Sequence, residues 1–170
     1  MPAPSASSAR RRFDDALRFS TKVNEVLGAY DVPHRLRDEP ATLIGRLNHT
    51  FMLLITVGAF DAFLTERCQE LGIRPHDKDP RCVSFRDRLI DLRPDCVGEA
   101  EWELRVDDAY DLYYEARTLW MHGAGMPDPI RRPVKDAGLF DIDENGRHWV
   151  TVNLWSGCVC ALRGLADGCR

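Results

Sequence analysis

The chain has 170 residues, of which 44% are hydrophobic, and its formal net charge is −4 at pH 7. This length suits a single domain that buries its own core, and no run of about 18 apolar residues is present that could span a membrane. The acidic balance excludes a protein that holds nucleic acid mainly by neutralising phosphates, because that mode needs an extended basic surface.

The N-terminal residues have an unusual composition. Residues 1–12 are rich in serine, alanine and arginine and contain no acid. We therefore expect a disordered basic tail over 1–12, followed by a single domain over 13–170. The start of the chain also lacks the apolar core of a secretory signal, which favours a cytoplasmic location.

Six cysteines occur in a chain that is long enough to build its own core, so reduced thiols are expected rather than a disulfide framework. Cys158 and Cys160 form a C-x-C pair, with Cys169 and His148 nearby, and a zinc-stapled scaffold is one hypothesis for this group. Structural zinc sites usually combine two separated ligand pairs. Buried small side chains are therefore favoured, and we expect no metal and no cofactor.

Two long helices are predicted in the first half of the chain. Apolar residues approximate one face over 13–30, and Asp14 and Asp15 fall in the first turn, where the helix dipole favours acids. The second helix is predicted from about residue 40 to about residue 71, and Gly72 supplies a stop signal.

The middle of the second helix, over 51–64, is apolar on nearly every face. Such a helix is expected to be surrounded by others as the centre of a bundle, and Gly58 is expected to allow close backbone approach. Asp61 is the single charge in this run and needs a partner or water. It is either a pocket residue or the edge of an exposed stripe.

Further helices and a ribbon are predicted downstream. A short helix over 83–92 precedes a long one over 99–121, which two glycines and two prolines end. The inward face of the long helix is predicted to contain Trp102, Val106, Ala109, Tyr113, Ala116 and Trp120. Segments 139–142 and 149–154 flank an Asn-Gly turn signal and predict a two-stranded hairpin, followed by a helix over 154–166. The expected fold is mostly α, with long antiparallel helices and a small C-terminal β-hairpin.

The segment EARTLWMHGAG, residues 115–125, places Arg117 and His122 near the end of the long helix, with four residues between them. This pattern, in a helical protein with a long apolar helix, resembles the HEPN family, whose members carry an arginine and a histidine at four-to-six-residue spacing on a helix of a small bundle. The resemblance implies a HEPN-like bundle and a metal-independent endoribonuclease with Arg117 and His122 as the catalytic pair. It further implies a toxin or antiviral effector with an antitoxin or another inhibitory partner.

The chemistry of the pair fits this reading. A histidine transfers protons near neutral pH, and an arginine stays charged and can bind two phosphate oxygens, so RNA could be cut by 2′-hydroxyl attack without a metal. A spacing of five residues places the two side chains roughly 140° apart on a regular helix. One copy does not converge on one phosphate, so a homodimer with a composite active site is expected.

Further residues are candidates for supporting roles. Thr118 stands where the family often has asparagine, and it shares a helix face with His122. Glu115 could orient His122 or be a solvated charge, and Tyr114 could stack a base or simply pack. A local basic patch that could contact RNA, or be solvated surface charge, consists of Arg131, Arg132 and Lys135. Thr118 and the acidic balance also favour an alternative, a catalytically inactive HEPN-fold interaction or RNA-binding module.

Overall fold

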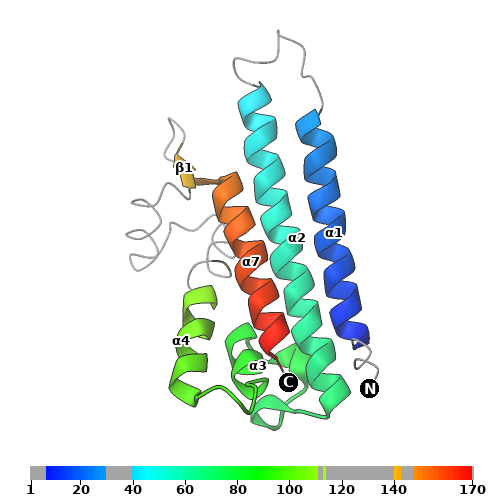
Figure 1. Cartoon of the computed structure of the whole chain (residues 1–170), viewed down its shortest axis with the longest axis vertical. Helices are drawn as coiled ribbons and strands as arrows, with labels where there is room; N and C mark the ends of the chain where they lie inside the picture. Colours follow the sequence, from blue (N-terminus) through cyan, green and yellow to red (C-terminus); the bar gives the residue numbers. More distant parts are fainter. Residues whose placement is uncertain (1–6, 30–39, 111–112, 114–139, 143–147, 170) are drawn as a thin grey trace.

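The computed structural model describes residues 7–29, 40–110, 113, 140–142 and 148–169. The described chain is mostly helical, as the sequence predicted, and its helices form a bundle (Figure 1). The long helices are α1 (Ser8–Ala29), α2 (Pro40–Leu71) and α7 (Val152–Gly168), and the shorter ones are α3 (Phe85–Asp91) and α4 (Glu99–Ala109). Within the described ranges, no helix combines the length and the apolar character that crossing a membrane requires.

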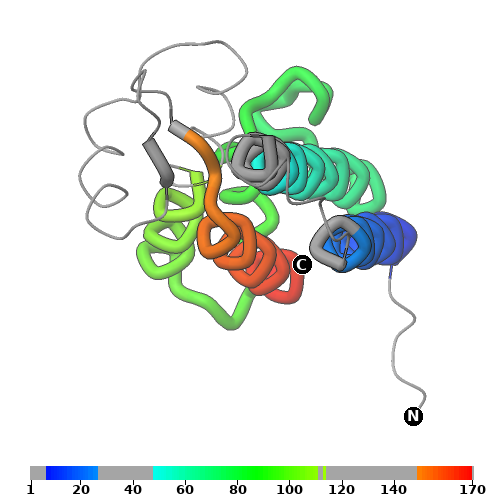
Figure 2. The backbone as a smooth tube through the Cα atoms, turned by 90° about the horizontal axis from the view of Figure 1, so that it is seen from above, coloured from blue at the N-terminus to red at the C-terminus, as the bar shows by residue number. Residues whose placement is uncertain are grey.

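Helix α2 is the centre of this arrangement. It packs against α1 and α7 along its length and also contacts α3 and the strand β2 (His148–Val150). Seen from above, α1 and α4 lie on opposite sides of the molecule, with α7 between them (Figure 2). Phe60 of α2 is fully buried, and its ring lies 5.3 Å from Phe13 of α1 and 5.4 Å from Phe85 of α3, measured between ring centroids. The main core therefore joins three helices through one residue of α2.

Helix α2 begins and ends where the sequence predicted. The expectation that other helices surround its middle is only partly confirmed. Gly72 has a φ of +67°, a left-handed conformation that suits glycine and ends the helix after Leu71. The prediction of close packing at Gly58 is wrong, because a Cβ there would meet nothing within 4 Å. Phe51 and Ile55 are 51% and 36% exposed. Among the described residues, the other helices therefore leave one stripe of α2 exposed.

Helix α1 begins at Ser8, five residues earlier than predicted, so Ser8 to Arg12 are helical and do not belong to a disordered tail. Ala9 is fully buried, and the Ser7 hydroxyl accepts a hydrogen bond from the Arg10 amide at 3.1 Å. The earlier start also means that Asp14 and Asp15 lie beyond the first turn, contrary to the prediction. Asp14 instead forms an ion pair with Arg10 at 3.1 Å.

A carboxylate from α2 stabilises the first turn of α1. Glu70 accepts hydrogen bonds from the Ser8 hydroxyl at 2.7 Å and from the Ala9 amide at 3.1 Å, and it pairs with Arg67 at 3.0 Å. Burial alone would raise the pKa of Glu70, but these hydrogen bonds together outweigh it and lower the pKa from 4.5 to about 2. Glu70 therefore satisfies an amide of the first turn of α1 in addition to the one that the local cap, Ser7, satisfies.

Replacement of Glu70 by glutamine is expected to lower the free energy of unfolding at pH 7 by about 1 kcal/mol, since solvent screens this partly exposed group. A lowered pKa in the folded state means that the stabilisation is complete above about pH 5 and is lost as the pH falls toward 2. Urea unfolding of the parent and of Glu70→Gln measures this at pH 7 and at about pH 3. The difference between their free energies of unfolding should be smaller at the lower pH. Glu25→Gln, which removes an exposed pair with Lys22, is the control. An equal effect of Glu70→Gln at both pH values would contradict this account.

Helix α3 begins later than predicted because two short 3₁₀ turns precede it, Pro75–Asp77 and Pro80–Cys82. Ser84 caps α3 by accepting a hydrogen bond from the Asp87 amide at 3.1 Å. His76 and Asp77 have φ values of 52° and 57°, in the left-handed region that non-glycine residues seldom adopt. The loop before α3 is therefore fixed by local geometry that the apolar pattern does not reveal.

Helix α4 starts at Glu99, as predicted. Four predicted inward positions are buried, namely Trp102, Val106, Ala109 and Tyr113, whereas Ala116 and Trp120 lie outside the described residues. The Trp102 indole N–H donates to the Leu89 carbonyl at 2.7 Å, which joins α4 to α3. The backbone at Tyr110 and Tyr113 is π-helical, a wider turn that often occurs near functional sites.

The C-terminal part contains the predicted ribbon. Strand β1 (Phe140–Ile142) pairs antiparallel with β2, with Phe140 opposite Val150, and the turn that joins them lies outside the described residues. The second strand ends earlier than predicted because Thr151 starts α7 by accepting a hydrogen bond from the Leu154 amide at 3.3 Å. Helix α7 then extends beyond the predicted 154–166 at both ends.

Candidate functional site

Most of the candidate residues lie beyond the part of the chain that the structure describes. The residues concerned are Arg117, His122, Thr118, Glu115, Tyr114, Arg131, Arg132 and Lys135. The structure does describe the helix that precedes them, as far as Tyr110 and then Tyr113. It also describes Asp61, the remaining candidate.

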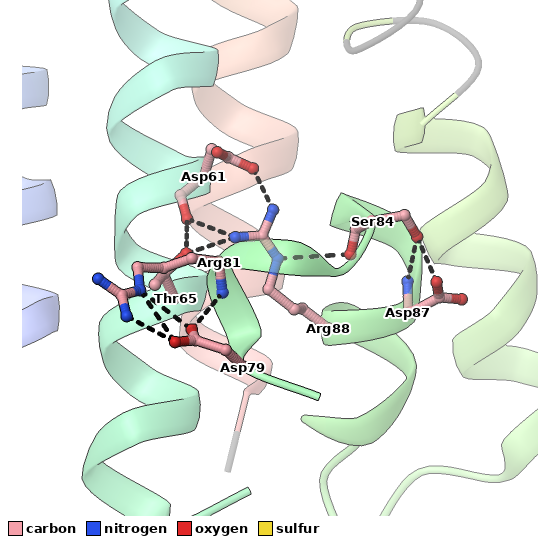
Figure 3. Close-up of polar contacts among 7 residues, drawn as sticks. All are labelled: Asp61, Thr65, Asp79, Arg81, Ser84, Asp87 and Arg88. Carbon is pink, nitrogen blue, oxygen red and sulfur yellow. Dashed lines mark hydrogen bonds and ion pairs between the residues drawn. The ribbon is translucent and has the colours of Figure 1, made fainter. Parts of the chain in front are cut away.

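Asp61 has a specific partner, Arg88 of α3. The Asp61 side chain is 41% exposed, whereas the Arg88 side chain is 5% exposed. One guanidinium nitrogen of Arg88 donates to the Asp61 carboxylate, and another donates to the Asp61 carbonyl at 3.3 Å (Figure 3). The charge in the apolar run is therefore at the edge of the exposed side of α2, and an ion pair neutralises it.

The guanidinium of Arg88 is held by groups from two helices. It also donates to the Thr65 hydroxyl of α2 and, from Nε, to the carbonyl of Ser84 at 3.4 Å (Figure 3). A buried arginine whose donors already have acceptors has little capacity left for a phosphate. The arrangement therefore joins α3 to α2, and it does not constitute an anion-binding site.

A serine, an aspartate and a histidine meet at the start of α3. The Ser84 hydroxyl donates to Asp87 at 2.6 Å, and His76 Nε2 lies 3.5 Å from the other carboxylate oxygen of Asp87. Hydrogen bonds from Ser84 first, and then from His76, lower the pKa of Asp87. A hydrolytic triad needs the histidine next to the serine, whereas here the aspartate stands between them. This cluster caps α3 and does not activate a nucleophile.

A groove of about 330 Å³ runs between the end of α4 and α7, and Tyr113 is the last described residue of its lining before the motif in the sequence. Its lining includes Arg105, Asp108, Tyr113 and Cys160. Tyr113 is only 9% exposed, and its hydroxyl oxygen is 3.3 Å from the position that a Cβ on Gly157 would take. Burial, with a smaller effect of Cys158 and Cys160, raises the pKa of Tyr113 to about 12. Tyr113 therefore stays neutral at physiological pH and acts as a packing residue, not as a base.

The cysteines do not form the zinc site that was one hypothesis. Cys158 is fully buried, and burial raises its pKa, whereas Cys160 is exposed. A separation of two residues on α7 turns their side chains roughly 200° apart, so they cannot bind one ion together. Within the described ranges, no group of three or more histidine, cysteine or acidic side chains is placed to hold a metal.

The chain was compared with known proteins at the level of sequence and of structure. No protein-family model matches it, and no curated protein or solved structure is significantly similar to it. The resemblance to the HEPN family therefore rests on the motif and the helical layout of this chain alone.

Proposed function

We propose that this protein is a metal-independent endoribonuclease of the HEPN type. The observation that carries the proposal is the spacing of Arg117 and His122 on the helical pattern that begins as α4. That pattern has its predicted inward face at Trp102, Val106 and Tyr113, all of which are buried. The segment that contains the two motif residues thus follows directly from a helix packed against the bundle.

The proposed reaction uses the 2′-hydroxyl of the RNA as its own nucleophile. The 2′-oxygen attacks the adjacent phosphorus as its proton is removed, the bond to the 5′-oxygen breaks, and that oxygen takes up a proton. The products are a 2′,3′-cyclic phosphate and a 5′-hydroxyl. His122 would transfer protons, and Arg117 would stabilise the charge that develops on the phosphate oxygens.

Other candidates have supporting roles in this proposal. Thr118 would contact His122 or the phosphate through its hydroxyl, Glu115 would orient the imidazole, and Tyr114 would stack a base. A short basic patch would bind the flanking RNA and comprises Arg131, Arg132 and Lys135. Asp61 is not needed here, because Arg88 occupies its carboxylate.

The proposed partners follow from the same chemistry. Arg117 and His122 diverge on a regular helix, so we propose a homodimer in which two motif helices form one composite site. A ribonuclease of this kind would serve as a toxin or a defence effector and would need an antitoxin or another inhibitor. The net charge of −4 and the threonine at position 118 favour the second candidate, an inactive interaction or RNA-binding module.

The decisive experiment is RNA cleavage by purified protein. The parent protein, Arg117→Ala and His122→Ala are incubated with total cellular RNA in excess EDTA, and the new ends are tested for 2′,3′-cyclic phosphate. We expect cleavage by the parent and a loss of at least about 100-fold in each variant. Two exposed residues provide matched controls, His76→Ala and Arg105→Ala, which should cut like the parent. Intact RNA with folded parent protein, or equal cleavage by the motif variants, would favour the inactive module.

A further inference from the structure

Two cysteines lie at the same end of the bundle, one near the end of α2 and one directly after α7. Cys68 is fully buried in the core, and Cys169, which follows the last residue of α7, is half-buried. Helices α2 and α7 run in the same direction, so their C-terminal ends lie at one end of the molecule (Figure 1). Both thiols are free, and neither has a part in the proposed ribonuclease chemistry.

Each of the two cysteines continues the buried face of its helix. Cys68 follows Val57 by eleven residues, and Cys169 follows Leu162 by seven, so each cysteine lies within roughly 20° of a fully buried residue around the helix. Helices α2 and α7 pack against each other, and their buried residues belong to one hydrophobic core. Both thiols are therefore on core-facing sides of neighbouring helices.

The two cysteines also lie at nearly the same height. The Trp155 indole N–H donates a hydrogen bond to the Thr56 hydroxyl at 3.3 Å, which fixes the register of α7 on α2. Cys68 lies twelve residues beyond Thr56, and Cys169 lies fourteen residues beyond Trp155. At about 1.5 Å per residue, these separations are about 18 Å and about 21 Å in the same direction. At one height, core-facing residues of packed helices can bring their Cα atoms to the roughly 5.5 to 6 Å that a disulfide needs.

The first turn of α1 contacts the chain next to both cysteines. Arg10 forms an ion pair with Asp167 at 2.5 Å, and a backbone amide of the same turn donates to the Glu70 carboxylate at 3.1 Å. Asp167 precedes Cys169 by two residues, and Glu70 follows Cys68 by two. One turn of α1 therefore holds the ends of α2 and α7 together, independently of the register that Trp155 gives.

The electrostatics of the two thiols agree with this placement. Burial is the main cause that raises the pKa of Cys169 to about 12, and Cys68 contributes to the increase, whereas Arg67 and Arg10 oppose it. Burial also raises the pKa of Cys68 to about 11. Both sulfurs are therefore neutral near pH 7. A neutral thiol is a poor nucleophile, so oxidation of this pair is expected to be slow.

We infer that Cys68 and Cys169 are a dithiol that a low-molecular-weight disulfide, such as oxidised glutathione, converts into an intramolecular disulfide between the end of α2 and the residue after α7. This inference rests on the register and burial of the two cysteines and does not depend on the proposed ribonuclease activity.

The reaction is two successive thiol–disulfide exchanges. Cys169 reacts first because it is the more exposed thiol and, with an extended backbone, lies outside the helix. Its sulfur loses a proton and attacks one sulfur of the oxidant, and the other glutathione leaves as a thiol. Cys68 then loses its proton and attacks Sγ of Cys169, which displaces the second glutathione as a thiol. Two protein thiols are oxidised, and one glutathione disulfide is reduced to two thiols.

Peptide mapping without reduction tests the bond directly. The full chain is incubated in native buffer with excess oxidised glutathione, the remaining thiols are alkylated, and the protein is digested with trypsin. Cleavage releases Cys68 in peptide 68–78 and Cys169 in peptide 164–170, and each peptide contains a single cysteine. We expect the two peptides to be linked, and dithiothreitol to separate them.

Thermal unfolding of the same samples shows whether the bond fits the folded structure. Oxidation should raise the Tm of the parent by at least about 5 °C, because the bond closes a loop of about 100 residues. It should leave the Tm of Cys169→Ser nearly unchanged. Cys160→Ser is the matched control, since Cys160 is an exposed thiol on α7, and it should form the linked peptides and gain stability like the parent. Circular dichroism checks that each variant is folded.

Three outcomes would overturn the inference. The first is folded parent protein that yields no linked peptides after prolonged oxidation. The second is Cys169 bound only to glutathione or to a cysteine other than Cys68. The third is a linked pair without a rise in Tm, since the bond would then not fit the native arrangement of α2 and α7. RNA cleavage is measured separately on the reduced protein, so its absence refutes only the proposed function.

Discussion

Replacement of Phe60 by alanine is expected to lower the free energy of unfolding by about 4 kcal/mol. Phe60 is fully buried, and its ring contacts the rings of Phe13, Phe63 and Phe85 with centroids 5.3, 5.6 and 5.4 Å away. The substitution therefore removes apolar contacts with α1, α2 and α3 at once and leaves a cavity where these helices meet. Such a cavity cannot close without moving a helix.

Urea unfolding followed by circular dichroism measures this loss, and thermal unfolding should show a decrease of roughly 10 °C in Tm for a chain of this length. Leu104→Ala serves as the control, since Leu104 is 64% exposed and its truncation should change stability by less than about 0.5 kcal/mol. If Phe60→Ala destabilised the protein no more than this control, the arrangement of α1, α2 and α3 around Phe60 would be incorrect.

Replacement of Arg88 by methionine should lower the free energy of unfolding by about 3 kcal/mol. The Arg88 side chain is 5% exposed and hydrogen bonds to Asp61, Thr65 and Ser84, so its loss leaves polar groups at the α2–α3 contact without their donor. The expected loss of stability lies at the lower end of the range for breaking a buried ion pair, because Asp61 is 41% exposed and water can replace part of the interaction.

The same helix contains a matched control. Arg86 pairs with Asp107 at 2.6 Å, but both side chains are at the surface, 40% and 46% exposed. Arg86→Met should therefore cost less than about 1 kcal/mol in the same urea experiment. Similar effects of the two substitutions would show that Arg88 is not the buried residue that joins α3 to α2.

The sequence predicted those parts of the fold that local signals determine. Start and stop signals, Pro40 and Gly72, predicted the bounds of α2, and apolar periodicity predicted the inward face of α4 as far as Tyr113. The start of α1 was missed because its local cap, Ser7, is followed by a run of three arginines and not by an apolar pattern, and because the second capping group, Glu70, lies on another helix. A contact between distant parts of the chain leaves no trace in local periodicity.

Contacts between distant parts of the chain also limited what could be predicted of the candidate site. Asp61 was recognised as a charge that needs a partner, but Arg88 could not be identified, because the two residues are 27 positions apart on different helices. The available signal was that Arg88 lies in the sequence between Phe85 and Leu89, two residues that are buried, which indicates that Arg88 is buried as well. Arg117 and His122 remain a prediction from the motif, since they lie outside the described residues.

The ion pair between Arg10 and Asp167, at 2.5 Å, joins the first described helix to the last. Contacts between residues so far apart in the chain form only after nearly all of the polypeptide is in place, and closing so long a loop is entropically unfavourable. The α1–α2 hairpin, in contrast, brings together neighbouring segments. We therefore expect α1 and α2 to associate early during folding and α7 to dock late, so that destabilising changes in α7 chiefly accelerate unfolding.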